Sequence, residues 1–228
     1  MNKVNHFSDK KHYIITSTNE IDTYFTFLPS VYQMWKKHIP NCTFVLGFIS
    51  NKTEDDKFTK RVKQFCDEFY LFKRIPDIDS GVQAKTTRLY LSTLYNNNIC
   101  TFVDIDQYLL DFDWFFNKVA LAFEENKFVA IGENGYNHTN DVGKWPMPYN
   151  TAPSSVFKQI VNYENHKDYF TWFDSYKIIK NPIDFKESVL NDFSNFSDES
   201  LLRYIMIKHP DQEFIKNVWV RKDREDYF

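Results

Sequence analysis

The stretch ICTFVDIDQYLL, residues 99–110, decides the fold, because it joins a run of mostly apolar residues to two closely spaced carboxylates. A short continuous apolar run is typical of a strand buried on both faces, as in a parallel sheet. Asp104 and Asp106 follow that run directly. Ligands of open α/β sheets bind at the carboxyl ends of the strands. We therefore predict a strand that begins at Ile99 and a metal or phosphate site where it ends.

The chain before this stretch alternates strand-like with helix-like segments. The predicted strands cover residues 12–18, 43–50 and 68–75. The predicted helices cover residues 21–38, 53–68 and 80–98, the last with Ser80 as its N-cap. Such alternation is the pattern of βαβ units. The sequence therefore predicts an α/β fold with a mixed, mostly parallel central sheet flanked by helices.

The second half of the chain has fewer clear segments. We predict a helix over 111–126, a strand over 127–135, a helix over 197–214 capped by Ser197, and a short strand over 215–222. Residues 134–155 are rich in Gly, Pro, Asn and Ser and contain Trp145 and Tyr149. A loop of about 20 residues without its own structure is usually functional or disordered. The two aromatic residues favour a functional loop.

Composition limits the class of protein. The 228 residues suit one domain, 1–228, and the formal charge of -3 comes from interspersed acids and bases, so we expect no nucleic-acid partner. The three cysteines match neither a disulfide framework nor a zinc site. The N-terminus has no apolar signal-peptide core, and no segment approaches 18 consecutive apolar residues. We expect a soluble, cytoplasmic protein without a transmembrane segment.

The pattern Asp-x-Asp occurs three times, and context separates the copies. The pairs are Asp77 with Asp79, Asp104 with Asp106, and Asp111 with Asp113. The first pair lies in a turn after a proline and the third begins a helix, so turn formation and capping explain both. Only the middle pair ends an apolar strand.

The middle pair has the chemistry of a cation site. Residues i and i+2 of an extended strand point the same way, so Asp104 and Asp106 can present two carboxylates on one face. Mg²⁺ or Mn²⁺ takes oxygen ligands, commonly one or two carboxylates together with substrate phosphates. The alternative is a strand end followed by an ordinary polar turn.

The helix before this strand carries two cations on one face. Lys85, Arg88 and Ser92 stand at i, i+3 and i+7, while apolar residues can cover the other face. Arg suits a bidentate grip on phosphate or sugar oxygens. A solvated helix face is the alternative explanation for both cations.

The run TTRLYLSTLYNNNICTFVDIDQYLL, residues 86–110, resembles the core of nucleotide-sugar glycosyltransferases of the GT-A fold. It is most similar to the glycogenin-like and lipopolysaccharide galactosyltransferase group and to compact members from large viruses and bacteria. The resemblance is specific over residues 80–110. It implies a nucleotide-binding half at about 10–110 and an acceptor-side half at about 111–220. It also implies Mn²⁺ or Mg²⁺, a UDP-sugar donor and a glycan or glycoconjugate acceptor.

The resemblance also implies roles for single residues. Asp104 would face the ribose or the metal, Asp106 would ligate the metal, and Arg88 would contact the donor. The segment Thr16, Ser17 and Thr18 matches the usual place of nucleobase contacts. Lys85 and Ile105 complete the expected donor-binding set. His209 stands where some members have a metal-binding histidine.

An inverting transferase also needs a carboxylate base near the acceptor hydroxyl. Asp198 and Glu199 are candidates by resemblance, although acids in the first turn of a helix also satisfy its free N–H groups. Asp174 lies among aromatic residues, where burial would raise its pKa toward the range of a general base. Glu133, Trp145 and Tyr149 are candidates for contacts with the acceptor. Without a signature of retaining members, retention and inversion both stay open.

Two other functions compete with a transferase. A haloacid-dehalogenase-like phosphatase also uses Asp-x-Asp at a strand end, with the first Asp as nucleophile. That class expects this strand early in its domain and Thr or Val where this chain has Tyr108. A non-catalytic carbohydrate-binding or scaffold protein would make the acids incidental. Metal-dependent UDP binding separates the transferase from the scaffold, and phosphate release from phosphomonoesters indicates the phosphatase.

Overall fold

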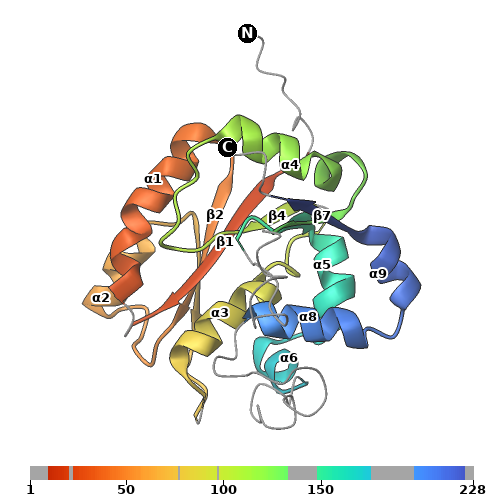
Figure 1. Ribbon diagram of the computed structural model, residues 1–228. Coiled ribbons are helices and arrows are strands. Elements are labelled where there is room, and N and C mark those ends of the chain that lie inside the picture. The colour runs from red at the N-terminus through yellow and green to blue at the C-terminus, as the bar shows by residue number, and fades with distance from the viewer. Residues whose placement is uncertain are drawn as a thin grey trace, which may run out of the picture.

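Seven strands form one sheet in the computed structural model, which describes residues 10–20, 23–76, 78–96, 98–132, 148–175 and 198–223 (Figure 1). Their order across the sheet is β3-β2-β1-β4-β6-β5-β7. The strands are β1 (His12–Asn19), β2 (Thr43–Ile49), β3 (Glu68–Phe72), β4 (Ile99–Phe102), β5 (Phe128–Gly132), β6 (Thr151–Pro153) and β7 (Trp219–Asp223).

Strand direction confirms the predicted mixed, mostly parallel sheet. The pairs β1–β2, β2–β3, β1–β4 and β5–β7 are parallel. Only β6 runs the other way among the described strands, antiparallel to both β4 and β5. β6 is three residues long, and its pairing with β5 is recorded at a single position, Val129 opposite Thr151.

Helices lie on both sides of this sheet (Figure 1). They are η1 (Thr23–Phe27), α1 (Leu28–His38), α2 (Lys57–Lys63), α3 (Ser80–Leu91), α4 (Phe112–Glu124), α5 (Ser154–Val161), α6 (Tyr169–Ser175), α8 (Asp198–Lys208) and α9 (Gln212–Val218). One hydrophobic cluster joins the sheet to α3, α5, α6 and α8, and the other joins it to α1, α2 and α4. The sheet is therefore the middle of three layers.

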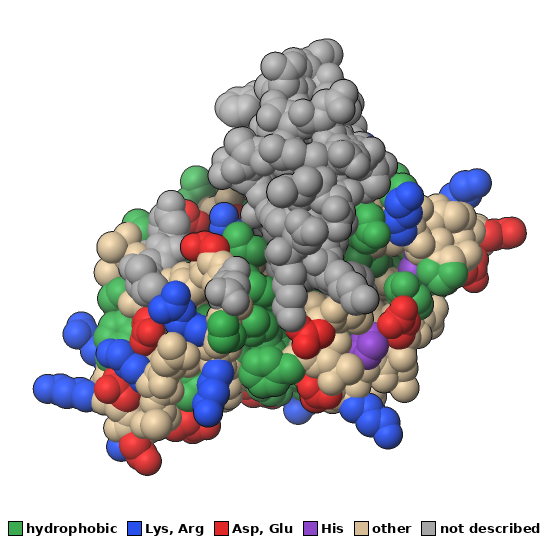
Figure 2. All heavy atoms as spheres, turned by 90° about the horizontal axis from the view of Figure 1, so that it is seen from below, with side chains coloured by type: hydrophobic (Ala, Val, Ile, Leu, Met, Phe, Trp, Pro, Cys, Tyr) green, Lys and Arg blue, Asp and Glu red, His purple; other side chains and the backbone are tan. Residues whose placement is uncertain are grey.

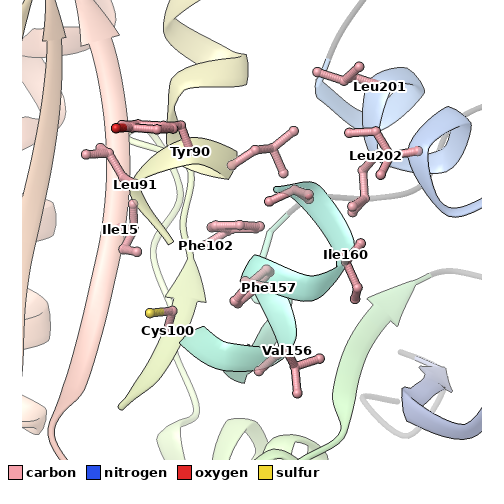
Figure 3. Packing of buried hydrophobic residues seen from close by; sticks show 14 of the residues in the cluster. Ile15, Tyr90, Leu91, Cys100, Phe102, Val156, Phe157, Ile160, Leu201 and Leu202 are labelled. Atoms are coloured by element: carbon pink, nitrogen blue, oxygen red, sulfur yellow. The ribbon is translucent and has the colours of Figure 1, made fainter. Parts of the chain in front are cut away.

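Alternation along β1 explains why its sequence is apolar at three consecutive positions, Tyr13, Ile14 and Ile15. Tyr13 and Ile15 pack in the cluster under α3, whereas Ile14 between them packs in the cluster under α1. A strand covered on both faces needs apolar residues at odd and even positions alike. Figure 3 shows the α3 side of the sheet, where Ile15 and Phe102 from the strands meet Leu91, Phe157 and residues of α8. The rings of Phe102 and Phe157 are 4.6 Å apart.

A glycine in β2 sets the distance between α3 and the sheet. A Cβ atom on Gly47 would lie 2.9 Å from Cδ1 of Leu91 and 3.1 Å from Cγ2 of Thr87. Both side chains belong to α3. The helix thus packs closely on β2, and a larger residue at position 47 would require the side chains of Leu91 and Thr87, or α3 itself, to shift.

Helix boundaries correct several predictions in the first half. The N-cap of α3 is Asp79, whose side chain accepts hydrogen bonds from the N–H groups of Gly81 and Val82, so Ser80 is the first helical residue. The predicted helix over 80–98 ends at Leu91, where Ser92 caps it. The predicted helix over 53–68 is shorter, because Asp56 caps α2 just before Lys57.

Further corrections fall in the second half. Pro210, which lacks a backbone N–H, follows α8, and Asp211 then caps α9, so the helix predicted over 197–214 is two helices. α9 continues to Val218 and delays the last strand to Trp219. The polar composition around residue 150 concealed β6, and α5 and α6 were not predicted. Residues 134–147 of the predicted loop, and residues 133–135 of the strand predicted over 127–135, lie outside the described residues.

Buried polar side chains connect three strands, β1, β4 and β6. His12 is 4% exposed, and its Nε2 lies 2.8 Å from Oγ1 of Thr101 in β4. Oγ1 of Thr101 is in turn 2.7 Å from Oγ1 of Thr151 in β6. The imidazole also packs against Phe115 and Phe123 of α4. Burial lowers the pKa of His12 to about 3, so the ring is neutral at ordinary pH.

Replacing Gly47 with Ala should lower the free energy of unfolding by about 1–3 kcal/mol, the usual range for overpacking a core. Leu91→Ala provides space for the new Cβ, so the double variant should lose less than the sum of the single losses. Denaturant unfolding of the four proteins measures this coupling. Strictly additive losses would contradict the close packing of α3 on β2.

His12 should make the protein less stable in mild acid. Its pKa is about 3 when folded and about 6.5 when unfolded, so below pH 6.5 the unfolded chain binds a proton that the folded chain excludes. Between pH 6 and 4 the free energy of unfolding of the wild type should therefore fall by up to about 1.4 kcal/mol per pH unit more than that of His12→Gln. The measurement is denaturant unfolding of both proteins at several pH values. Parallel curves for the two proteins would refute this role of burial.

Candidate functional site

The order of the strands reverses beside β1, and this reversal locates the candidate site. From β1 the chain proceeds to β2 and then β3 on one side, and β4 returns to the other side of β1. In open α/β sheets ligands bind outside the carboxyl ends of the strands at such a switch point. Here those ends are the last residues of β1 and the residues that follow β4.

Polar side chains join the end of β1 to the first turns of α3. The Ser17 hydroxyl donates a hydrogen bond of 2.5 Å to the carbonyl of Ala84. Nδ2 of Asn19 donates to Oγ of Ser80 over 3.2 Å. The first strand was predicted to end at Thr18, whereas β1 continues to Asn19, a polar residue that no sequence pattern marked as functional. α3 is therefore fixed over this end of β1.

The other two residues of the predicted nucleobase segment belong to the opposite face. Thr16 and Thr18 alternate with their neighbours in the same way as Ile14, so they lie on the face of β1 that packs under α1. They are only 1% and 3% exposed, and neither Oγ1 has a hydrogen-bond partner among the described residues. Buried hydroxyls without partners are uncommon and destabilising, and each needs an explanation. Polar groups of a ligand at the strand end are one such explanation.

The end of β4 differs from the expectation that Asp104 and Asp106 share one face of an extended strand. β4 ends at Phe102, and the N–H of Gln107 donates to the carbonyl of Asp104 over 3.3 Å, which closes a turn. Strand alternation therefore does not extend to the acidic pair. Ile105 between the two acids is buried in the cluster under α1, while Asp106 is exposed.

Arg88 approaches Asp104 from α3. Its Nη1 donates to Oδ1 of Asp104 over 2.5 Å and to the carbonyl of Val103 over 3.2 Å. The side chain of Arg88 is 7% exposed and that of Asp104 is 27% exposed. Lys85, which the sequence placed on the same helix face, is exposed. The solvated-face alternative thus fits Lys85 but not Arg88, because α3 is covered around most of its circumference.

The oxygen atoms of Asp104 and Asp106 fit a hard divalent cation that is completed by substrate oxygens. No cluster of three or more His, Cys, Asp or Glu side chains suited to a metal occurs in the described ranges.

Both ring nitrogens of His209 are hydrogen-bonded to the backbone. Its Nδ1 accepts a hydrogen bond from the N–H of Asp211 over 3.1 Å, so Nε2 is the nitrogen that donates, at 2.9 Å, to the carbonyl of Gln159. The ring is 6% exposed. A metal at His209 would have to displace one of these contacts.

The candidate bases lie on helices. Asp174 is in α6 and is exposed, which corrects the expectation that it is buried among aromatic residues. Asp198 and Glu199 begin α8, where acids are favourable, and Glu199 is half-buried.

Of the predicted acceptor contacts, only Tyr149 lies in the described part of the chain. Its side chain is 8% exposed and packs 5.9 Å from the ring of Phe115. Its φ of 66° is unusual for a bulky residue, and its N–H donates to the carbonyl of Phe102 at 2.6 Å. Glu133 and Trp145 lie outside the described residues.

Figure 2 shows the molecule from below the view of Figure 1. Acidic and basic side chains are interspersed there among hydrophobic ones, and the described surface on this face has no broad patch of one charge. Among the described helices, none has the length and apolar character needed to cross a membrane.

No family model matches this chain, and no curated protein sequence does. Among solved structures, the chain is similar to the glycosyltransferase GlyE of Streptococcus pneumoniae TIGR4, with 12% identity, a TM-score of 0.45 and 96% of this chain covered. The match covers 46% of GlyE, so this chain spans about half of that protein.

Two other structures have comparable similarity. The galactosyltransferase LgtC, solved with donor and acceptor sugar analogs, has 12% identity and a TM-score of 0.44, covering 92% of this chain and 72% of LgtC. A 4-diphosphocytidyl-2C-methyl-D-erythritol synthase has 11% identity and a TM-score of 0.43, covering 86% of this chain and 98% of the synthase.

Proposed function

We propose that this protein is a metal-dependent glycosyltransferase of the GT-A type. It would move a sugar from a nucleotide-sugar donor, with a UDP-sugar as first candidate, to a hydroxyl of a glycan or glycoconjugate. The observation that carries the proposal is the position of Asp104 at the switch point, partly exposed and ion-paired with Arg88. The resemblance of residues 86–110 to such enzymes gives the same assignment.

The ends of β1 and β4 would bind different parts of the donor. At β4, Asp104 and Asp106 supply oxygen ligands beside the diphosphate. At β1, the hydroxyls of Thr16 and Thr18 lack partners within the described structure and can bond a polar part of the nucleoside. Exposed Lys85 on α3 offers a further positive charge to phosphate oxygens.

Charge explains why such a site would need a cation. Two carboxylates repel a diphosphate, and a divalent ion bound between the carboxylates and the diphosphate reverses that repulsion and stabilises the charge of the departing nucleotide.

The protein also has to orient the acceptor and accept its proton. Asp198, Glu199 and Asp174 are the proposed candidates for the base. Glu133, Trp145 and Tyr149 are those for acceptor contacts, and His209 is proposed as a further metal ligand. A cytoplasmic location is also part of this proposal.

Calorimetric titration of UDP with and without Mn²⁺ tests the proposal. Wild type should bind UDP only with the metal, and Asp106→Asn should weaken that binding at least about 10-fold, since one charged ligand is lost. Asp113→Asn is the matched control, because Asp113 is exposed in the first turn of α4. Failure of wild type to bind any nucleoside diphosphate would refute the proposal. Release of phosphate from phosphomonoesters would favour the phosphatase instead.

Thr16→Val and Thr18→Val test the β1 contribution separately. Each change removes a buried hydroxyl without a partner at nearly constant shape, so the free protein should unfold at a higher temperature. UDP affinity with Mn²⁺ should fall several-fold if the same hydroxyl bonds the nucleotide. Thermal unfolding with and without UDP and Mn²⁺ measures both effects. Higher stability with unchanged affinity would remove these two residues from the donor site.

A further inference from the structure

We infer that Arg88 is a positioning residue, which acts on the donor site by orienting Asp104. The inference rests on the proposed function and changes the role that the resemblance implies for Arg88, namely direct contact with the donor. Its basis is the hydrogen bonding at the end of β4.

One nitrogen of Arg88 holds two groups from neighbouring residues. Nη1 donates both to the carbonyl of Val103 and to Oδ1 of Asp104. The Val103 contact fixes the backbone that carries Asp104, and the second contact fixes the rotation of its carboxylate. Val103 is held from the other side too, because its N–H donates to the carbonyl of Ile15 over 3.0 Å. The carboxylate therefore has one defined orientation.

Burial assigns different tasks to the two partners. A guanidinium as buried as that of Arg88 is costly unless charged or polar acceptors surround it, so its hydrogen bonds to the β4 end hold it in place. Asp104 is more exposed, and a carboxylate has acceptor capacity beyond one hydrogen bond. Its remaining capacity is available to a cation. Direct contact of Nη1 with the donor would require this nitrogen to leave the Val103 carbonyl and the Asp104 carboxylate.

The position of Arg88 is itself set by packing. Its helix lies against the backbone of Gly47 and is bonded to β1 through Ser17. Arg88→Lys would keep the positive charge, but it would replace the planar guanidinium with a single ammonium group on a flexible side chain. Arg88→Lys therefore separates the effect of orientation from that of charge.

The test compares Arg88→Lys and Arg88→Met with wild type in two measurements. Mn²⁺ binding in the presence of UDP, followed by electron paramagnetic resonance, should weaken about 10-fold in Arg88→Lys and further in Arg88→Met. Circular dichroism and thermal unfolding report whether each variant folds. Thr87→Ala is the matched control, because Thr87 is the buried neighbour of Arg88 in α3 but bonds Gln83 and Tyr169. It should lose stability and keep its Mn²⁺ affinity.

A double-mutant cycle with Asp104→Asn identifies the route of the effect. If Arg88 acts through Asp104, Arg88→Lys should weaken UDP binding in the wild-type background and leave it almost unchanged in the Asp104→Asn background. Ligand-observed NMR can measure UDP binding even when the complexes are weak. Equal losses in both backgrounds would assign Arg88 to direct donor contact and overturn the inference. Unchanged Mn²⁺ affinity in folded Arg88→Lys would also overturn it while the proposed function stands. If wild type bound neither Mn²⁺ nor UDP, the proposed function would fail as well.

Discussion

The close packing of α3 on the sheet is the constraint on which the candidate site depends. Because Gly47 has no side chain, α3 lies against the backbone of β2, and its polar groups reach the ends of β1 and β4. A helix displaced outward by one methyl group would carry Ala84 and Arg88 away from their partners Ser17 and Asp104. The geometry of a polar site is thus determined by an apolar contact, since packed interiors transmit small shifts.

The fold was largely predictable because the hydrophobic pattern determines it. β2 is buried on both faces and is therefore an almost continuous apolar run. β1 has three consecutive apolar residues, Tyr13, Ile14 and Ile15, so the sequence marks both strands well. β6 was missed because three residues in a polar context carry no periodic signal. α8 and α9 were merged because a helical pattern spans the break at Pro210, and only the capping residue Asp211 marks the new start.

The strand end that carries the candidate site was predictable, but the geometry of its side chains was not. The apolar run before Asp104 correctly indicated a strand end, but strand alternation could not show that a turn begins there. Helical periodicity placed Lys85 and Arg88 on one face, whereas tertiary contacts bury only Arg88. The unpartnered hydroxyls of Thr16 and Thr18 depend on packing from several elements. No local pattern can reveal such a long-range property.

The short strand β6 has a consequence for cooperativity. It is the described link between two parallel blocks of sheet, β3-β2-β1-β4 and β5-β7, and it meets β5 at one recorded position. The buried hydrogen bond between Thr101 and Thr151 strengthens the junction of β6 with β4. Within the described part of the chain, no side-chain hydrogen bond joins β6 to β5. Local opening follows the weakest boundary between well-bonded units. Amide exchange should therefore occur in two blocks, with the boundary between β6 and β5.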